Sequence, residues 1–421
     1  MNTELEVAYD GEFIGHLVEG ATADWAFVYA PDFVSRAPKG KLLSLNFPAR
    51  EAVYRGGDLA AVFHNLLPDG AIRRQLAVKL GISEGNDFAL LGAIAGDCPG
   101  ALTLAPPGQR CFVDHEIRCL TEQDLRNVFA ALPLQPLLSE VEGARFTLPG
   151  THHKIAVRVV SEQIALALGN ALSSHIAKPA KNGLRESVMN EGYCLELAHN
   201  MGLPSVEAIV RHGAVTVLLV ARVDREWRDG RWRAIHMEDL GQLCGALPGR
   251  IFEREGGLGA VDCLNAIKRY SVVPAADMQA YLRWLMFCYL IGNGGGHARQ
   301  LAIQHLPAGP RLAPFYGLMS THVYPALNQQ MAMAIGGEDR PDWITPTRWR
   351  EFAAQAGING AYTLLLLSDL AERIPQTSAL VADRFQRQHG SAAVIRDIQR
   401  LIKQRARQVL VSLQAEKSQA H

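Results

Sequence analysis

The sequence predicts an α+β protein built from a β-rich lobe followed by a helical lobe. Up to about residue 108, and again from 146 to 224, short apolar runs alternate with polar residues and turn signals, as in strands. Beyond residue 237 the apolar residues recur at helical spacing. This order of elements indicates a bilobal layout, in which the ligand site is expected in the cleft between the lobes.

Turn residues mark the ends of the expected segments. Gly81 ends a predicted helix, and Pro133 and Pro136 precede a polar stretch that indicates a domain boundary. The expected helices lie at 59–67, 71–80, 191–200, 238–246, 276–290, 348–356, 361–374 and 391–413, and the expected strands include 154–160 and 215–223. The predicted segments are an N-terminal subdomain at 1–108, a linker at 109–143, a β-rich lobe at 144–236 and a helical lobe at 237–421.

The composition excludes several classes of protein. Hydrophobic residues make up 48% and charged residues 20% of the 421 positions, which is typical of a folded globular chain. Lys plus Arg and Asp plus Glu number 42 each, so no overall basic field favours nucleic acid. One local run of arginines could form a basic patch, although we favour a solvated charged hairpin. The run consists of Arg222, Arg225, Arg228, Arg231 and Arg233. We therefore predict no direct binding to nucleic acid.

The cysteines and the apolar stretches indicate a cytoplasmic protein. The seven cysteines are odd in number and form no C-x-x-C pair, which fits reduced thiols and argues against a zinc site or a disulfide framework. The N-terminal residues are polar and do not resemble a signal peptide. The longest strongly apolar stretch, residues 281–292, is shorter than the roughly 20 residues that a membrane helix needs. We expect no membrane binding.

Eight short motifs occur in order along the chain. They are FHNLLPDG at 63–70, GDCPGAL at 96–102, LPGTHHKI at 148–155, HIAKP at 175–179, RVDR at 222–225, IGN at 291–293, LAPFY at 312–316 and MAMAIGGE at 331–338. Taken together over about residues 5–350, they resemble the HipA family of bacterial serine/threonine kinase-like toxins. The resemblance implies a bilobal kinase fold with an N-terminal β-rich subdomain, a mixed β-rich N-lobe and an all-helical C-lobe. It also implies an ATP site between the lobes.

The resemblance further implies a type of partner and a type of substrate. Members of the family belong to toxin–antitoxin systems and pair with a small DNA-binding antitoxin of the helix-turn-helix type. In active members the substrate is typically an aminoacyl-tRNA synthetase, and its phosphorylation stops translation. For this chain we therefore expect a helix-turn-helix antitoxin-type protein or a related kinase as partner.

Matching the motifs residue by residue gives candidates for nucleotide binding. Gly150 lies in the segment that resembles the family's phosphate loop, where a glycine permits close approach of phosphate. Lys178 matches the nucleotide-binding lysine, although an ordinary lysine at a strand end is the alternative. The candidate set is Gly150, Thr151, His152, His153, Lys154, Lys178 and Arg222. Thr147 corresponds to a serine that can be autophosphorylated in the family. A metal at the His152-His153 pair is not expected, because neighbouring strand residues point to opposite faces.

The catalytic and metal-binding positions of the family are altered in this chain. The catalytic Asp corresponds to Gly295, a Mg²⁺-binding Asn corresponds to Gln300, and the metal-binding Asp corresponds to Gly317. His297 is retained, and we favour a structural role for it. Neither the catalytic residue nor the metal ligands are therefore intact, and ATP and Mg²⁺ are expected to bind weakly. Loss of a general base alone costs a rate factor of about 10²–10⁴.

These observations predict a pseudokinase of a toxin–antitoxin-type system that acts by protein binding. The alternative is an active, atypical HipA-type serine/threonine kinase toxin that blocks translation by phosphorylating an aminoacyl-tRNA synthetase. Such an enzyme would have to use displaced acidic residues, for which Asp224, Glu338 and Asp339 are candidates. A third possibility is that the glycines were introduced to silence a toxin. It is less favoured, because two further positions depart from the family pattern. Gln300 replaces an Asn, and Ala221 stands where an acidic residue usually precedes Arg222.

Overall fold

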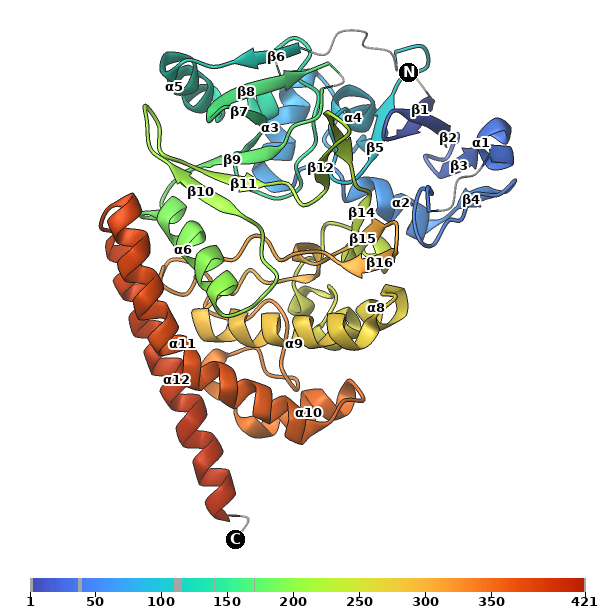
Figure 1. The fold of residues 1–421 in the computed structure, drawn as a ribbon. Helices are drawn as coiled ribbons and strands as arrows, with labels where there is room; N and C mark the ends of the chain where they lie inside the picture. Colours follow the sequence, from blue (N-terminus) through green and yellow to red (C-terminus); the bar gives the residue numbers. More distant parts are fainter. Residues whose placement is uncertain (1–2, 37–39, 110–115, 140, 170, 420–421) are drawn as a thin grey trace. The chain divides into compact units, whose positions relative to one another are not determined.

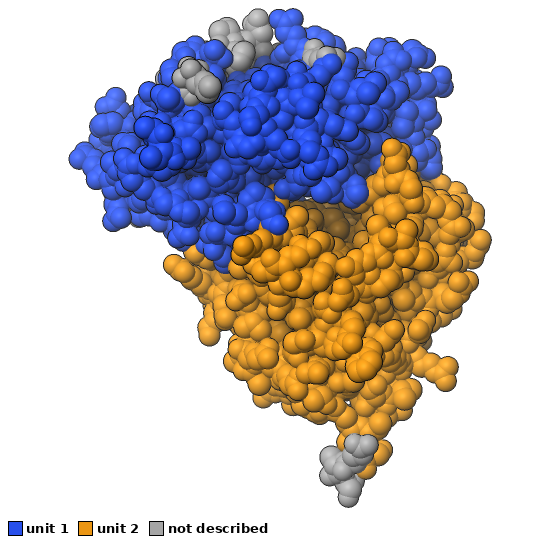
Figure 2. Space-filling model, turned by 180° about the vertical axis from the view of Figure 1, so that it is seen from behind, with its two compact units in different colours: residues 1–179, 211–249, 302–313 blue, residues 180–210, 250–301, 314–421 orange. Residues whose placement is uncertain are grey.

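The structure is a computed structural model that describes residues 3–36, 40–109, 116–139, 141–169 and 171–419. The chain divides into two compact units, which Figure 2 shows in different colours. Unit 1 comprises residues 1–179, 211–249 and 302–313, and unit 2 comprises residues 180–210, 250–301 and 314–421. Antiparallel sheets dominate unit 1 and helices dominate unit 2, which confirms the predicted α+β class. The four-segment division stays a prediction.

The first sheet of unit 1 is antiparallel and has the strand order β4-β3-β2-β1-β5 (Figure 1). Its strands are β1 (Glu4–Tyr9), β2 (Glu12–Glu19), β3 (Trp25–Tyr29), β4 (Val53–Arg55) and β5 (Leu102–Ala105). The helices of this region are α1 (Pro31–Arg36), α2 (Gly57–His64), α3 (Gly70–Leu80) and α4 (Asp87–Ile94). Phe27, Phe33 and Phe63 are fully buried in the core that the sheet and these helices share.

The second sheet of unit 1 holds the strands on either side of the proposed phosphate loop. It contains, in order, β11 (Val217–Ala221), β9 (His175–Pro179), β7 (Ile155–Val160), β8 (Gln163–Leu168) and β6 (Glu116–Cys119). Strand β7 follows the loop directly, and Ile155 pairs with Ala177 of β9. The neighbouring α5 (Glu122–Ala131) begins with a capping box at Thr121. Strand β10 (Ala208–Arg211) lies at the sequence boundary between the two units.

Two smaller sheets complete unit 1. Strands β12 (Arg225–Arg228) and β13 (Arg231–Ala234) form a hairpin, and β14 (Met237–Asp239), β15 (Ala302–Leu306) and β16 (Gly309–Leu312) form a three-stranded sheet. The predicted helix at 238–246 is therefore wrong at its start, since β14 pairs with β15 there. Only the short α7 (Leu240–Leu243) remains, and Asp239 caps it together with Gln242.

Unit 2 is built mainly from helices around a core of aromatic side chains. The helices are α6 (Ser187–Asn200), α8 (Ala260–Tyr270), α9 (Pro274–Ile291), α10 (Pro346–Gln355), α11 (Gly360–His389) and α12 (Ala393–Gln419). Short 3₁₀ helices lie at Glu253–Glu255, Ala298–Gln300 and Pro341–Trp343 in unit 2 and at Pro136–Leu138 in unit 1. Trp284 and Trp349 are fully buried, and α11 packs along α12 (Figure 1). None of the described helices is both long enough and apolar enough to cross a membrane.

Helix α11 extends well beyond the predicted end at residue 374. Pro375 lies inside it and cannot donate a backbone hydrogen bond. The side chains of Thr377 and Ser378 bond to the carbonyl oxygens of Arg373 and Pro375, at 3.1 and 2.9 Å. Packing of the apolar face of α11, including Leu370 and Ile374, then continues the helix past the proline.

Candidate functional site

The segment that was predicted to be the phosphate loop lies in unit 1, immediately before β7. Gly150 has φ +110°, a conformation that side-chain-bearing residues rarely adopt. Its N–H donates to Oδ2 of Asp69 at 2.9 Å, and its carbonyl accepts from the Asp69 N–H at 3.3 Å. The Lys154 ammonium donates to the carbonyl oxygen of Pro149. The glycine that would contact phosphate is therefore already bonded to a carboxylate.

Thr147 is fully buried at the start of this segment. Its neighbours Phe146 and Leu148 are also buried in the core of unit 1. Burial raises the pKa of the nearby Cys98 thiol to about 11, and the Thr147 hydroxyl oxygen has no hydrogen-bond partner among the described residues. In this conformation, Thr147 is not exposed to a phosphorylating enzyme.

The other candidates from this segment lie nearer the surface. Thr151 and His152 are exposed, while His153 is half-buried and burial lowers its pKa. Lys178 is half-buried on β9 and pairs across the sheet with Leu218 of β11. The structure thus brings Asp69, Gly150 and Lys154 together, and the nucleotide-binding roles of the candidate residues stay predictions.

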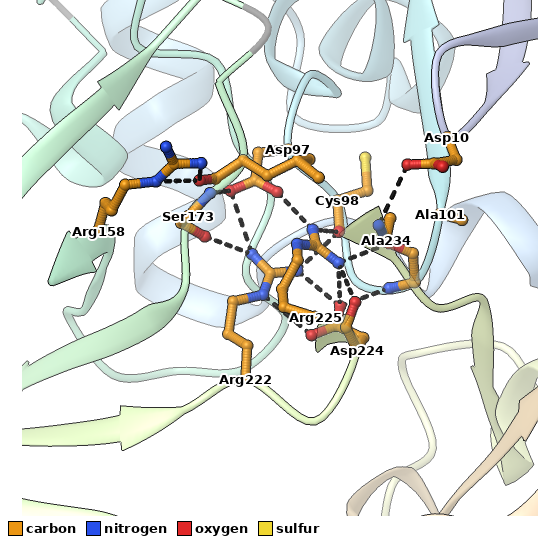
Figure 3. A network of polar contacts seen from close by, with 12 residues as sticks. Asp10, Asp97, Cys98, Ala101, Arg158, Ser173, Arg222, Asp224, Arg225 and Ala234 are labelled. Atoms are coloured by element: carbon orange, nitrogen blue, oxygen red, sulfur yellow. Dashed lines mark hydrogen bonds and ion pairs between the residues drawn. The ribbon is translucent and has the colours of Figure 1, made fainter. Parts of the chain in front are cut away.

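Arg222 belongs to a buried network of charges in unit 1 (Figure 3). Its guanidinium donates to both carboxylate oxygens of Asp224, at 3.0 and 2.7 Å, and forms an ion pair with Asp97 at 3.3 Å. Arg225 pairs with the same two carboxylates. Asp97 lies in the predicted N-terminal subdomain, whereas Arg222 directly follows strand β11 and Arg225 begins strand β12. The network therefore joins segments that lie about 125 residues apart.

The charges of this network stabilise one another. Burial alone would raise the pKa of the Asp224 carboxyl, but Arg222 and Arg225 outweigh that effect and lower it to about 2. The prediction of a solvated hairpin is wrong for these two arginines and holds for Arg228 and Arg231, which are exposed. Because the Arg222 side chain is 2% exposed and fully engaged, we do not include it among the proposed nucleotide contacts.

The glycine-rich segment at 292–296 follows α9 in unit 2. Gly292 ends the helix in the left-handed conformation, with φ +73°. A Cβ at Gly294 would lie 2.6 Å from Nε2 of His322 and 2.7 Å from the backbone oxygen of Gln330, so only glycine fits there. A Cβ at Gly295 would meet nothing closer than Oδ1 of Asn293, at 3.4 Å. Position 295, which the family resemblance matches to the catalytic Asp, therefore has room for a Cβ.

His297 follows this segment, and its surroundings favour the neutral form. Its ring packs edge-on against Phe252, with the centroids 6.1 Å apart. Burial, with a smaller contribution from Arg299, lowers the pKa of His297 to about 3. Its Nδ1 is buried without a hydrogen-bond partner within the described residues. At neutral pH His297 is therefore an uncharged, largely packed side chain.

Gln300 and Gly317, which the family resemblance matches to metal-binding positions, lie next to each other in unit 2. Gly317 has φ +66°, and a Cβ placed there would lie less than 3.0 Å from Oε1 of Gln300 and 3.1 Å from its Cδ. The amide of Gln300 thus fills the space in which a side chain at position 317 would begin. The two departures from the family pattern are sterically complementary.

The acidic residues considered as replacements are engaged elsewhere. Asp224 is buried in the arginine network, and hydrogen bonds from Arg340 lower the pKa of Glu338 to about 2. Asp339 accepts two hydrogen bonds from the Gln330 amide, at 2.9 and 3.0 Å. None of these three carboxylates is positioned by the described contacts as a general base beside Gly295.

His322 is a basic group close to the glycine-rich segment, but its contacts exclude a role as base. Arg405 of α12 donates to its Nδ1 at 2.7 Å, so the proton of the neutral ring lies on Nε2. Nε2 is the atom that faces Gly294, and a protonated nitrogen has no lone pair to accept a proton. Burial and the adjacent Arg405 also lower the pKa of His322 to about 4.

Three possible metal ligands converge in unit 1, among the residues that the structure describes. Ligand atoms of His236, Glu238 and His305 lie within 4.8 Å of one another. His236, however, accepts from the Ala101 N–H at 3.3 Å through Nδ1 and donates to the Leu43 oxygen at 3.1 Å through Nε2. His305 bonds to Glu238 at 2.9 Å. These bonds leave no lone pair on His236 for a metal, and we assign the group to hydrogen bonding.

Sequence reasoning missed the contacts of Asp69 and His322. Asp69 entered the sequence analysis only as part of the motif at 63–70, because its partner Gly150 is 81 residues away. His322 carries no local signal, since its neighbours Arg405 and Gly294 come from distant segments. The motif FHNLLPDG contains Asp69 and is the sequence signal that draws attention to this residue.

Comparison with known proteins gives matches along nearly the whole chain. Residues 146–378 match the family model of the HipA-like C-terminal domain, and residues 5–105 match that of the HipA N-terminal domain. The Sinorhizobium fredii protein named "Putative kinase Y4mE" is 31% identical over 390 residues, covering 90% of this chain and 92% of that protein. The serine/threonine-protein kinase toxin HipA of Shewanella oneidensis is 28% identical, covering 90% and 89%.

A solved structure agrees with these matches. The complex of HipA, HipB and operator DNA from the Shewanella oneidensis MR-1 toxin–antitoxin system contains a chain that superposes with a TM-score of 0.85 at 25% identity. The match covers 98% of each chain.

Proposed function

Since this chain belongs to the HipA family, we propose that it is a pseudokinase of a toxin–antitoxin-type system that acts by binding protein partners. The observation that carries the proposal is the contact between Gln300 and Gly317. At the position of the metal-binding Asp there is no side chain, and the adjoining space holds an amide. Together with Gly295 at the catalytic position, this contact removes the metal anchor and the base at once.

The chemistry of phosphoryl transfer explains why these losses matter. The reaction depends on positioning and on neutralising the charge of the transferred group, which the metal ions and the catalytic Asp provide. Mg²⁺ demands near-ideal octahedral geometry and is held by carboxylates. The Gln300 side chain is one methylene longer than the Asn of the family, and its amide fills the space beside Gly317. We therefore propose that Mg·ATP binds weakly and that phosphoryl transfer does not occur.

The contacts of nearby groups argue against the alternative of an active kinase that phosphorylates an aminoacyl-tRNA synthetase. His322 presents a protonated nitrogen toward Gly294, and His297 is neutral and packed. Glu338 is bound to Arg340. An active enzyme would need one of these groups to exchange its partners during catalysis.

The proposed partner is a helix-turn-helix antitoxin-type protein, with a related kinase as the second choice. The similar Shewanella oneidensis chain was solved in a complex with HipB and operator DNA, which supports a partner of the HipB type here. For this chain itself we propose no direct contact with nucleic acid. A cytoplasmic location is proposed as well, because the six cysteines among the described residues are all free thiols.

Thermal unfolding with ATP tests the proposed loss of the metal anchor. A ligand raises the unfolding temperature in proportion to its occupancy of the folded state. We expect ATP to give the same small shift with Mg²⁺ and with EDTA, because no carboxylate at position 317 can hold the metal. A large shift that requires Mg²⁺ would contradict the proposal.

A further inference from the structure

The Asp69 carboxylate occupies one end of the loop that is proposed to bind phosphate. Asp69 is the N-cap residue of α3, and an Asp at this position ordinarily accepts a hydrogen bond from the first turn of its own helix. Here its side chain makes no such bond and instead accepts from the Gly150 N–H at 2.9 Å. The backbone N–H of Asp69 donates in return to the Gly150 oxygen at 3.3 Å. The residue therefore clamps the loop at both polar groups of one glycine.

We propose that Asp69 is an internal anion that holds the loop closed and competes with the phosphates of a nucleotide. The inference rests on the proposed role of the Gly150 segment in phosphate binding. A phosphate that used the Gly150 N–H would have to displace a carboxylate from it, and a second negative charge nearby would repel the phosphate. Asp69 would thus lower nucleotide affinity independently of the missing metal ligands.

Two contacts of Lys154 also hold the loop in the closed conformation. The Lys154 ammonium, a candidate to bind phosphate, is folded back onto the Pro149 carbonyl. A Cβ at Gly150 would lie 3.0 Å from Lys154 Nζ, so the ammonium also closes over the glycine. The Gly150 N–H and the Lys154 ammonium therefore already have internal partners, which a phosphate that used these groups would have to replace.

The other end of the loop is held by the same subdomain. The Asp97 N–H donates to the Arg145 oxygen at 2.8 Å, and Asp97 and Phe146 form a parallel bridge. Asp97 is itself fixed by Arg222 and Arg225. Since Thr147 lies between these two attachments and is fully buried, exposure of its hydroxyl requires release of at least one of them. Release of the Asp69 clamp breaks two hydrogen bonds, whereas release at Asp97 disrupts the buried charge network.

The substitution Asp69→Asn separates the charge from the hydrogen bond. The Asn oxygen can still accept from the Gly150 N–H, so the clamp geometry is kept while the negative charge is removed. Asp69→Ala removes both. The matched control is Asp32→Asn, which removes a charge from an exposed position on α1 of the same unit. Circular dichroism and thermal unfolding establish that each variant is folded.

Isothermal titration with ATP in EDTA measures the effect on the full-length chain. We expect Asp69→Asn to bind ATP about tenfold more tightly than the unmodified chain, as removal of one nearby charge implies, and more so at low salt. Asp32→Asn should leave the affinity unchanged. Unchanged or weaker binding by Asp69→Asn overturns the proposal, and so does an absence of ATP binding in every variant.

Hydrogen exchange provides a second readout that does not depend on nucleotide. The amides of residues 147–154 should exchange faster in Asp69→Ala than in Asp69→Asn, because only the alanine removes the acceptor. Equal exchange in both variants would show that the clamp does not restrain the loop. Radiolabelled ATP keeps this test apart from the proposed function. Label transfer by Asp69→Asn would contradict the pseudokinase and leave the clamp standing.

Discussion

The substitution Gly317→Asp places a carboxylate at the position that is proposed to have lost a metal ligand, and the structure predicts that it destabilises unit 2. Two costs contribute. The φ of +66° at position 317 is unfavourable for a residue with a side chain, which costs about 1–3 kcal/mol, toward the low end for Asp. The new Cβ would also lie less than 3.0 Å from Gln300 Oε1, and because this atom is the tip of a flexible, half-buried side chain, displacing it costs less than about 1 kcal/mol. We expect a total loss of about 1–3 kcal/mol.

A matched control separates the two costs. Gly337 has a similar φ of +79° in the same unit, but a Cβ there would meet nothing within 4 Å. Gly337→Asp should therefore show the backbone cost alone. Combining Gly317→Asp with Gln300→Asn should recover up to about 1 kcal/mol, because the shorter amide withdraws from the crowded space.

Urea unfolding followed by tryptophan fluorescence measures these differences, since Trp284 and Trp349 are buried in unit 2. The double-mutant cycle gives the coupling between positions 300 and 317 directly. The reasoning is refuted if Gly317→Asp costs no more than Gly337→Asp, or if the cycle shows no coupling.

Three further outcomes are expected. Arg222→Ala removes one of the two buried arginines that pair with Asp97 and Asp224 and should lower the unfolding free energy by about 3–5 kcal/mol in urea, whereas Arg228→Ala, at an exposed position, should change it by less than about 0.5 kcal/mol. The pKa of Asp224 falls from 3.8 to about 2 on folding, so its contribution to stability is complete above pH 3.8 and is lost as the pH falls toward 2. Acid unfolding should accordingly begin at higher pH in Arg222→Ala, and an identical acid midpoint would contradict the assigned ion pairs. Gly295→Asp has room for its Cβ and should cost less than about 1 kcal/mol without restoring phosphoryl transfer, while Gly294→Asp collides with the Gln330 backbone and should cost about 1–3 kcal/mol. Equal stabilities of these two variants would show that the packing around the segment is misassigned.

The sequence predicted the class of the fold because periodicity and turn residues are local signals. The helix at Pro274–Ile291 was expected at 276–290. Gly292 ends it in the left-handed conformation, which glycine adopts readily. The helix that continues through Pro375 was missed, since packing of its apolar face outweighs the local effect of proline there. Strand β14 was missed because its partner, β15, lies more than 60 residues away.

For the candidate site, the sequence predicted only which types of residue are present or absent. The sequence shows that carboxylates are absent from positions 295 and 317. It does not show that the Gln300 amide fills the space beside Gly317, or that Asp69 leaves its own helix to bond with Gly150. The sequence also suggested that Arg222 is solvated. Its ion-pair partner Asp97 lies far away in the chain, so the sequence could not show that the pair is buried. Long-range contacts decide all three cases.

Transfer of radiolabelled phosphate from ATP tests the central claim most directly. The purified chain, incubated with ATP and Mg²⁺, is analysed for label and by mass spectrometry at Thr147, with Lys178→Ala as the control. The proposed loss of the base and of the metal anchor, together with the buried Thr147, predicts no incorporated label and no phosphate on Thr147. Stoichiometric label on the unmodified chain, abolished by Lys178→Ala, would contradict the pseudokinase and favour an active kinase.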